Sequence, residues 1–336
     1  MTNIKLYVLN LQLLATQVTT QDSLSAEMKT FYDMTLIDEA SANLVHDQFG
    51  QKRPIPSGGG KTIEFRKFSP LAKATTPITE GVTPAGKDLT VTAITATVNQ
   101  YGDFIVQSDI LELTALDNTI LEATKLLGKQ AGATLDTVVR DVLQSGTNVT
   151  YCPKIGADGA ETAVTSRANL DATCKLTVDV VQQVVAKLRA QNAPTIGGKY
   201  VAIIHPYVAY DLMRDPEWID AHKYTNPTNL YEGEIGEIAG VRFVQTTEAK
   251  IYKNGDNPAV FGSLFFGENA YGVTEITGGG LQTIVKQKGS AGTGDPLDQR
   301  SSVGWKAIKT AEILVQNYLV RVESCSPRFS ATAVAN

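Results

Sequence analysis

Residues 62–98 hold the feature that most limits the folds open to this chain, a tongue of two strand-like stretches joined by a long irregular segment. Thr62 to Phe68 and Leu89 to Val98 alternate apolar and polar side chains, which predicts two strands. In the second stretch the apolar parity shifts by one residue, which predicts a β-bulge near Ala93. Ser69 to Asp88 is rich in Pro, Thr and Gly, and an irregular segment of about 20 residues is uncommon inside a compact domain. Because a two-stranded ribbon is marginally stable alone, we expect the tongue to lie on another surface, for which a neighbouring subunit is the natural candidate.

The strongest helical pattern runs from about Asn118 to Ser145. Its stripe at steps of three and four consists of Ile120, Thr124, Leu127, Ala131, Leu135, Val138 and Val142. At 1.5 Å per residue this rod is on the order of 40 Å long. Gly128 and Gly132 lie inside it, where each costs roughly 1 kcal/mol relative to Ala. Because they are four residues apart they share one face, and we expect another backbone element to pack closely across them.

The rest of the sequence predicts an arm and a helix before the tongue and a compact α/β block after the rod. Apolar residues recur at near-helical spacing between residues 31 and 45, and Pro and Gly clusters end that pattern by residue 60. Residues 176–300 contain both helix-like and strand-like stretches, and residues 301–336 predict further strands and a polar tail. The expected fold class is therefore α+β.

Composition argues against several classes of protein. The net charge of -5 and the pI near 5.4 disfavour a chain that grips nucleic acid, which usually carries a basic patch, although a weakly acidic wall can still enclose DNA. An odd number of widely spaced cysteines, Cys152, Cys174 and Cys325, predicts reduced thiols. We expect no signal peptide in Met1 to Leu14 and no membrane helix, which needs roughly 18 consecutive apolar residues.

No motif in the sequence predicts a catalytic, phosphate-binding or metal-binding site. Gly58 to Thr62 lacks the spacing of a phosphate-binding loop and predicts a flexible hinge. The three histidines have no carboxylate or cysteine at metal-binding spacing. Asp136 and Arg140, four residues apart on the rod, predict a surface ion pair. We therefore expect no enzymatic activity, no catalytic residues, no cofactor and no bound metal.

A series of short motifs runs from the tongue through the rod. They are Thr79-Glu80-Gly81-Val82-Thr83-Pro84, Ile94 to Asp103, Ser108-Asp109, Glu122-Ala123-Thr124, Leu126 to Gly132 and Leu135 to Leu143. In their order and spacing they resemble the major capsid proteins of tailed bacteriophages of the phage N4 type, which have the HK97 fold. The resemblance is dense from Glu80 to Gly146 and follows only the order of the parts after Thr150.

The resemblance implies five parts: an N-terminal arm and helix (1–60), an E-loop hairpin (61–98), a P-domain (99–175) with a spine helix (118–145), an α/β A-domain (176–300), and P-domain return strands with a C-terminal tail (301–336). It implies a major capsid protein that forms pentamers and hexamers and self-assembles into an icosahedral head shell around double-stranded DNA. The implied location is the virion, after assembly in the host cytoplasm. Portal and scaffolding proteins, and possible decoration proteins, are the expected partners, without a membrane or sequence-specific DNA contacts.

The resemblance also assigns roles to particular residues. The E-loop residues expected to contact a neighbouring subunit are Lys73, Thr79, Glu80, Val82, Pro84 and Lys87, and Gly128 and Gly132 are expected to pack the spine helix. An encapsulin-type compartment shell, another virion component such as a tail-tube or decoration protein, and, less favoured, an α/β enzyme with an unrecognised site stay open as alternatives.

Overall fold

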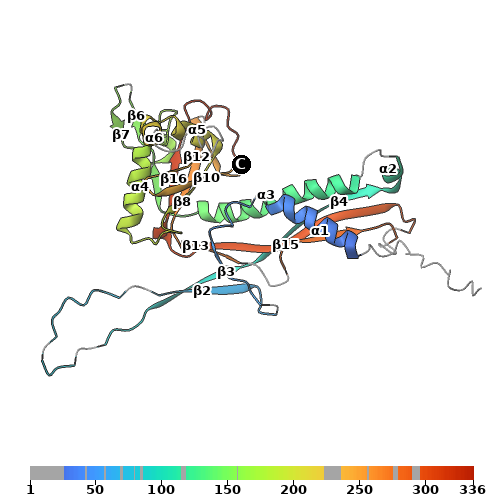
Figure 1. The fold of residues 1–336 in the computed structure, drawn as a ribbon, viewed down its shortest axis with the longest axis horizontal. Helices are drawn as coiled ribbons and strands as arrows, with labels where there is room; N and C mark the ends of the chain where they lie inside the picture. The colour runs from blue at the N-terminus through green and yellow to red at the C-terminus, as the bar shows by residue number, and fades with distance from the viewer. Residues whose placement is uncertain are drawn as a thin grey trace, which may run out of the picture.

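A computed structural model describes residues 26–41, 44–56, 58–68, 71–78, 80–83, 86–114, 119–156, 158–222, 236–255, 257–274, 279–289 and 296–336. Figure 1 shows an elongated molecule with three parts. A compact block of helices and strands forms one end, a long helix on a long sheet reaches to the other end, and a hairpin projects from the middle.

The long helix is α3 (Thr119–Gln144), within one residue at each end of the helix predicted at 118–145. It lies along a sheet of β1 (Gln51–Lys52), β4 (Asn99–Ser108), β13 (Tyr271–Thr274), β14 (Gln282–Lys286) and β15 (Arg300–Ile313). The strand order is β1-β13-β15-β14. Strand β4 pairs with β15 on the edge opposite β14. The 14 residues of β15 therefore join β4, β14 and β13 into one surface, and the short helix α2 (Asp109–Thr114) follows β4 at the far end.

The core of this part lies between α3 and the sheet. Leu127, Ala131 and Leu135 of α3 pack against Val303, Trp305 and Ala307 of β15. Helix α1 (Ala26–Ser41) crosses α3 and adds Leu36 to the same core. Alternate residues of β15 thus face α3, as expected for a strand with one covered face.

The compact block is a seven-stranded sheet with helices around it. The sheet order is β5 (Val149–Tyr151), β16 (Leu319–Ser324), β12 (Asn257–Phe266), β8 (Tyr200–Ile204), β10 (Val241–Gln245) and β9 (Glu237–Ile238), with β11 (Ile251–Asn254) paired to β12. Its helices are α4 (Val178–Ala190), α5 (Pro206–Met213) and α6 (Pro216–His222), and a small hairpin of β6 (Lys154–Ile155) and β7 (Glu161–Thr162) lies at its edge. Thr177 caps α4 by accepting a hydrogen bond from Val180 N, and all five residues of β8 are buried.

The projecting hairpin consists of β2 (Thr62–Phe68) and β3 (Val91–Thr97). Its strands pair without interruption from Thr62 opposite Thr97 to Phe68 opposite Val91, so the β-bulge predicted near Ala93 is wrong. The parity shift has another cause: the two ends of β3 use opposite faces. Ile94 and Ala96 pack with Phe65 against Leu314, whereas Val91 and Ala93 are exposed on the other face.

Candidate assembly surfaces

The tongue carries large apolar side chains exposed to solvent along its described residues, as far as the start of β3. They are Leu71, Ile78, Val82, Leu89 and Val91. Lys73, Glu80 and Lys87 are exposed as well, and Lys87 Nζ donates to the carbonyl oxygen of Ala72 across the tongue at 2.8 Å. Two predicted contact residues, Thr79 and Pro84, lie outside the described residues. Large exposed aliphatic residues that recur along a projecting segment indicate a surface that another molecule covers.

The base of the hairpin is fixed to the body. Phe65 and Ala96 are buried against Leu314, and the guanidinium of Arg53 lies 5.9 Å from the centre of the Phe65 ring. Gly58 and Gly60, just before β2, have φ values of 84° and 86°, and a Cβ atom at either would meet nothing within 4 Å. The base of the hairpin is therefore held to the body, and the adjoining Gly58 and Gly60 have left-handed backbone conformations that glycine adopts without strain.

A second exposed apolar surface lies on the sheet, on the face turned away from α3. Gly304 of β15 pairs with Phe104 of β4 on one side and with Ile284 of β14 on the other. The ring of Phe104 is 67% exposed and Ile284 is 37% exposed, and the cavity between them measures about 370 Å³. Because a glycine forms the floor between two large side chains, the surface is a groove along β15.

A third exposed surface lies at the far end of the molecule. Ile110, Leu111 and Leu113 of α2 are exposed, and so is Leu297, which lies in the loop before β15. The backbone N–H of Asp109 donates to the carbonyl oxygen of Gln299 at 3.0 Å, which holds α2 beside this loop.

The surface on α2 and the groove along β15 were not predicted from the sequence. Consecutive apolar residues in one strand, Phe104-Ile105-Val106, were the available signal for the groove.

The two glycines of α3 lie where α1 crosses it. A Cβ atom at Gly132 would lie 2.4 Å from the carbonyl oxygen of Ala40, and one at Gly128 would lie 2.9 Å from the carbonyl oxygen of Leu36. The backbone of α1 therefore occupies the space that a side chain would need. This close approach is the physical reason for two glycines in the interior of a long helix.

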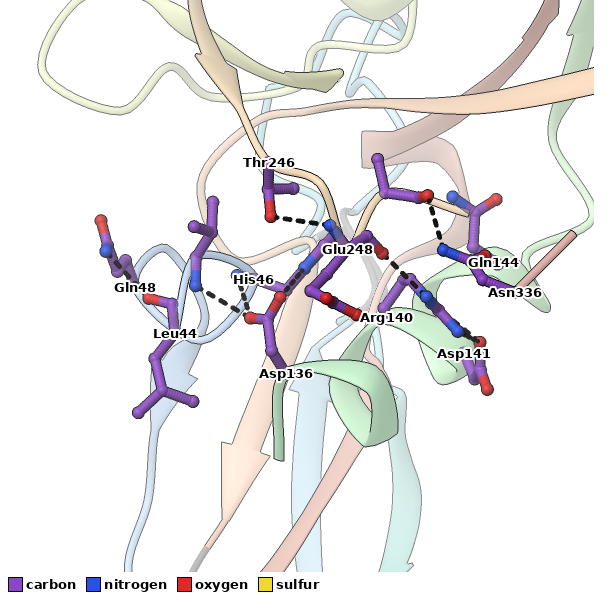
Figure 2. Close-up of polar contacts among 12 residues, drawn as sticks. Leu44, His46, Gln48, Asp136, Arg140, Asp141, Gln144, Thr246, Glu248 and Asn336 are labelled. Carbon is purple, nitrogen blue, oxygen red and sulfur yellow. Dashed lines mark hydrogen bonds and ion pairs between the residues drawn. The ribbon is translucent and has the colours of Figure 1, made fainter. Parts of the chain in front are cut away.

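Asp136 and Arg140 do not form the surface ion pair that their spacing predicts. Their side chains are 0% and 2% exposed, and each binds a different segment of the chain. Asp136 accepts hydrogen bonds from the backbone N–H groups of Val45 (2.9 Å) and His46 (2.7 Å) and from His46 Nδ1 (2.7 Å), as Figure 2 shows. Arg140 pairs with Asp141 instead, and its Nη1 donates to the carbonyl oxygen of Glu248 at 2.8 Å.

The titratable groups offer little reactivity. Burial raises the pKa of Cys325 to about 12 and raises the pKa values of Cys152 and Cys174, which makes these thiols poor nucleophiles. Burial lowers the pKa of His205, the N-cap of α5, to about 4. Within the described ranges no group of three His, Cys, Asp or Glu side chains is arranged to hold a metal ion. Among the helices that the structure describes, none is both long and apolar enough to cross a membrane.

These features define a class of protein: an HK97-like capsid fold, in which a long helix on a long sheet joins an α/β block and a projecting hairpin. Residues 19–289 match the model of the phage capsid protein family, and the chain belongs to that family. It is therefore a structural protein of the phage shell, present in many copies in the capsid of the virion.

Solved capsids have the same fold at low sequence identity. The capsid of cyanophage P-SCSP1u is 15% identical over 84% of this chain and 88% of its own, with a TM-score of 0.63. The capsid of cyanophage Pam1 is 14% identical over 98% of this chain and 100% of its own, also with a TM-score of 0.63. The capsid of Ralstonia phage GP4 is 14% identical over 84% and 88%, with a TM-score of 0.57. No curated protein sequence matches the chain.

Proposed function

We propose that the chain is the major capsid protein of a tailed phage of the N4 type, and that its pentamers and hexamers close into an icosahedral head around double-stranded DNA. The observation that carries this proposal is the tongue. Its aliphatic side chains are exposed on a hairpin that leaves the body of its own subunit (Figure 1). Such a segment gains stability only when a second copy covers it.

The groove along β15 is the surface that suits the tongue of a neighbouring copy. It is apolar at Phe104 and Ile284, and it is open because Gly304 forms its floor. The exposed side chains of Val82 and Leu89 would cover Phe104 and Ile284. The polar residues Asp103, Lys286 and Ser302 also line the groove. Because tongue and groove are different surfaces of one chain, the contact is heterologous, and the proposed assembly requires a rotation that closes it into rings of five and six.

Several weak contacts per copy suffice to build the shell. Linked contacts raise the effective concentration of each further contact, so tongue, groove and α2 surfaces act together. One chain has to occupy both pentamers and hexamers, which requires a change of angle between tongue and body. Gly58 and Gly60 supply that freedom, because both have positive φ values and a Cβ atom at either would meet nothing within 4 Å, whereas Gly59 is held by a hydrogen bond from its N–H to the carbonyl oxygen of Pro56.

The further roles follow from the same proposal. Assembly takes place in the host cytoplasm with portal and scaffolding proteins, and decoration proteins bind the finished shell where they occur. The net charge of -5 suits a wall that encloses DNA without gripping its sequence. The chain has no catalytic role in the proposal. An encapsulin-type shell is the less supported alternative, since the matching family model is a phage capsid family.

The test is electron microscopy of the purified protein, produced alone and with the genes that flank it. Closed shells, pentamers or hexamers are expected. Removal of residues 69–88 and the substitution Val82→Ser should both reduce assembly, whereas Thr83→Ser, a matched change at the neighbouring exposed position, should not. Shells formed equally well without the tongue would refute its role. A wild-type protein that stays monomeric under all these conditions would refute the assembly itself.

A further inference from the structure

The second half of α3 carries two parallel stripes with different chemistry. Leu135, Val139 and Leu143 form an apolar stripe, and Asp136, Arg140 and Gln144, each one residue further on, form a polar stripe. All six side chains are buried. We propose that the polar stripe consists of positioning residues that fix the angle between the rod-and-sheet part and the α/β block, and thereby the curvature of the shell. This inference rests on the proposed assembly function.

The apolar stripe holds the two parts together without fixing their orientation. Val139 and Leu143 belong to a cluster that joins Ile203 and Leu264 of the block to Ile313 at the end of β15. Apolar burial depends on area and is non-directional, so it tolerates small rotations of α3 against the block. Another interaction has to select one orientation.

The first member of the polar stripe ties α3 to the segment after α1. Asp136 accepts three hydrogen bonds from Val45 and His46, and the hydroxyl of Tyr271 on β13 donates to the carbonyl oxygen of His46 at 2.5 Å. This segment leads into β1, which pairs with β13 of the long sheet. Asp136 therefore sets the position of α3 on the rod-and-sheet side.

The second and third members tie α3 to the block. Arg140 Nη1 donates to the carbonyl of Glu248, and a turn presents that carbonyl because Glu248 N donates to Thr246 Oγ1 at 3.1 Å. Gln144 Nε2 donates to the carbonyl of Gly262 at 2.8 Å, and Gln144 Oε1 accepts from the hydroxyl of Tyr252 at 3.0 Å. The guanidinium of Arg321 on β16 also donates to the carbonyl of Gln144.

The partner loop is itself held in place. Asn336 Oδ1 accepts from the backbone N–H of Ile251 at 2.9 Å, and Asn336 Nδ2 donates to the carbonyl of Ala249 at 3.2 Å. The carbonyl that Arg140 binds thus sits on a restrained loop. A rotation of α3 would stretch the hydrogen bonds that Arg140 and Gln144 donate to the block, and hydrogen bonds weaken steeply when they are bent or lengthened. Arg140 would keep its ion pair with Asp141 on the same helix but would lose its bond to the carbonyl of Glu248, and a buried polar group left without a hydrogen bond is costly.

The proposed assembly requires that neighbouring copies contact both parts of the subunit, so that the angle between the parts contributes to the angle between neighbours. In a closed shell the angle between neighbouring subunits sets the diameter of the particle. Substitutions that remove the hydrogen bonds of the polar stripe should therefore leave subunits folded and able to assemble, while they widen the range of particle diameters.

The experiment compares Arg140→Met, Gln144→Met, Arg140→Lys and Val139→Ala in the full chain, under the conditions that give wild-type shells. Particle diameters are measured by electron microscopy, and subunit stability by urea unfolding. Both Met variants should shift or broaden the diameter distribution, and Arg140→Lys, which keeps a charged donor, should restore it in part. Val139→Ala is the matched control: it removes buried apolar contact from the same helix, so it should lower the urea midpoint while leaving the diameters unchanged.

The inference is overturned if both Met variants give the wild-type diameter distribution, or if Val139→Ala broadens it as much as they do. Either result leaves the assembly function standing, because shells still form. Absence of shells from the wild-type protein would instead count against the proposed function itself.

Discussion

Gly132→Ala measures how closely α1 packs on α3. Replacing a helix-interior glycine with alanine stabilises a helix by about 1 kcal/mol. Here the new Cβ atom would lie 2.4 Å from the carbonyl oxygen of Ala40 and 3.0 Å from its Cα atom. Ordinary contact needs about 3.5 Å, so α1 has to move away by about 1 Å. Forcing an extra carbon into a packed site costs about 1–3 kcal/mol, which outweighs the gain in helix propensity.

Gly128→Ala is the control for this prediction. It brings the same gain in propensity, but its Cβ would lie 2.9 Å from the carbonyl oxygen of Leu36 and 3.0 Å from the Glu39 side chain, a milder overlap. We expect Gly128→Ala to be roughly neutral and Gly132→Ala to be less stable than it by about 1–2 kcal/mol. Urea unfolding followed by circular dichroism gives both values. A Gly132→Ala variant as stable as Gly128→Ala would refute the close backbone contact.

Three further predictions concern the buried polar groups. Asp136→Asn should lower the free energy of unfolding by about 2–4 kcal/mol, because the amide nitrogen replaces the Oδ2 atom that faces His46 Nδ1 and the bonds from Val45 N and His46 N lose a charged acceptor; a urea midpoint equal to that of wild type would contradict this. His205 has a pKa lowered by burial from 6.5 to about 4, so between those pH values the unfolded chain binds a proton that the folded chain excludes. Stability should therefore fall as the pH falls through this window, and His205→Gln should flatten that dependence in urea titrations at several pH values. The thiols of Cys152, Cys174 and Cys325 are buried with raised pKa values, so a thiol reagent should label them slowly in the folded protein and rapidly in urea, and fast labelling of the folded protein would be the contrary result.

Local sequence patterns were enough to predict the elements that define this fold. The rod was predicted because apolar residues recur at steps of three and four from Ile120 to Val142, and α3 spans Thr119–Gln144. At its end the buried stripe passes through Val139 and Leu143 instead of the predicted Val138 and Val142. The strands of the tongue were predicted because turn-forming residues separate two alternating stretches. The β-bulge was a wrong prediction because the parity rule assumes that one face is buried along the whole strand. In β3 only the half at Ile94 and Ala96 packs on its own subunit.

The polar stripe could not be predicted from the sequence. A charged residue at the edge of an apolar helix stripe is usually exposed, so Asp136 and Arg140 were interpreted as a surface pair. Their partners are backbone groups of Val45 and Glu248, which are 91 and 108 residues away in the chain. The pattern of side chains in a sequence does not indicate which distant backbone group will form a hydrogen bond with a given side chain. The positions of the tongue contacts on a neighbouring copy stay a prediction for the same reason.

Strand β15 makes the order of synthesis matter. It pairs with β4 through contacts such as Arg300 with Ser108, which are separated by most of the chain, and it also supplies the partner of β13 and β14. Contacts this distant in sequence close slowly and only after both partners exist. A chain still emerging from the ribosome has β4 and its tongue but lacks β15, so its groove does not yet exist. In the proposed assembly, a prematurely ended chain would present a tongue but no groove, and it could not accept the next subunit into a growing ring.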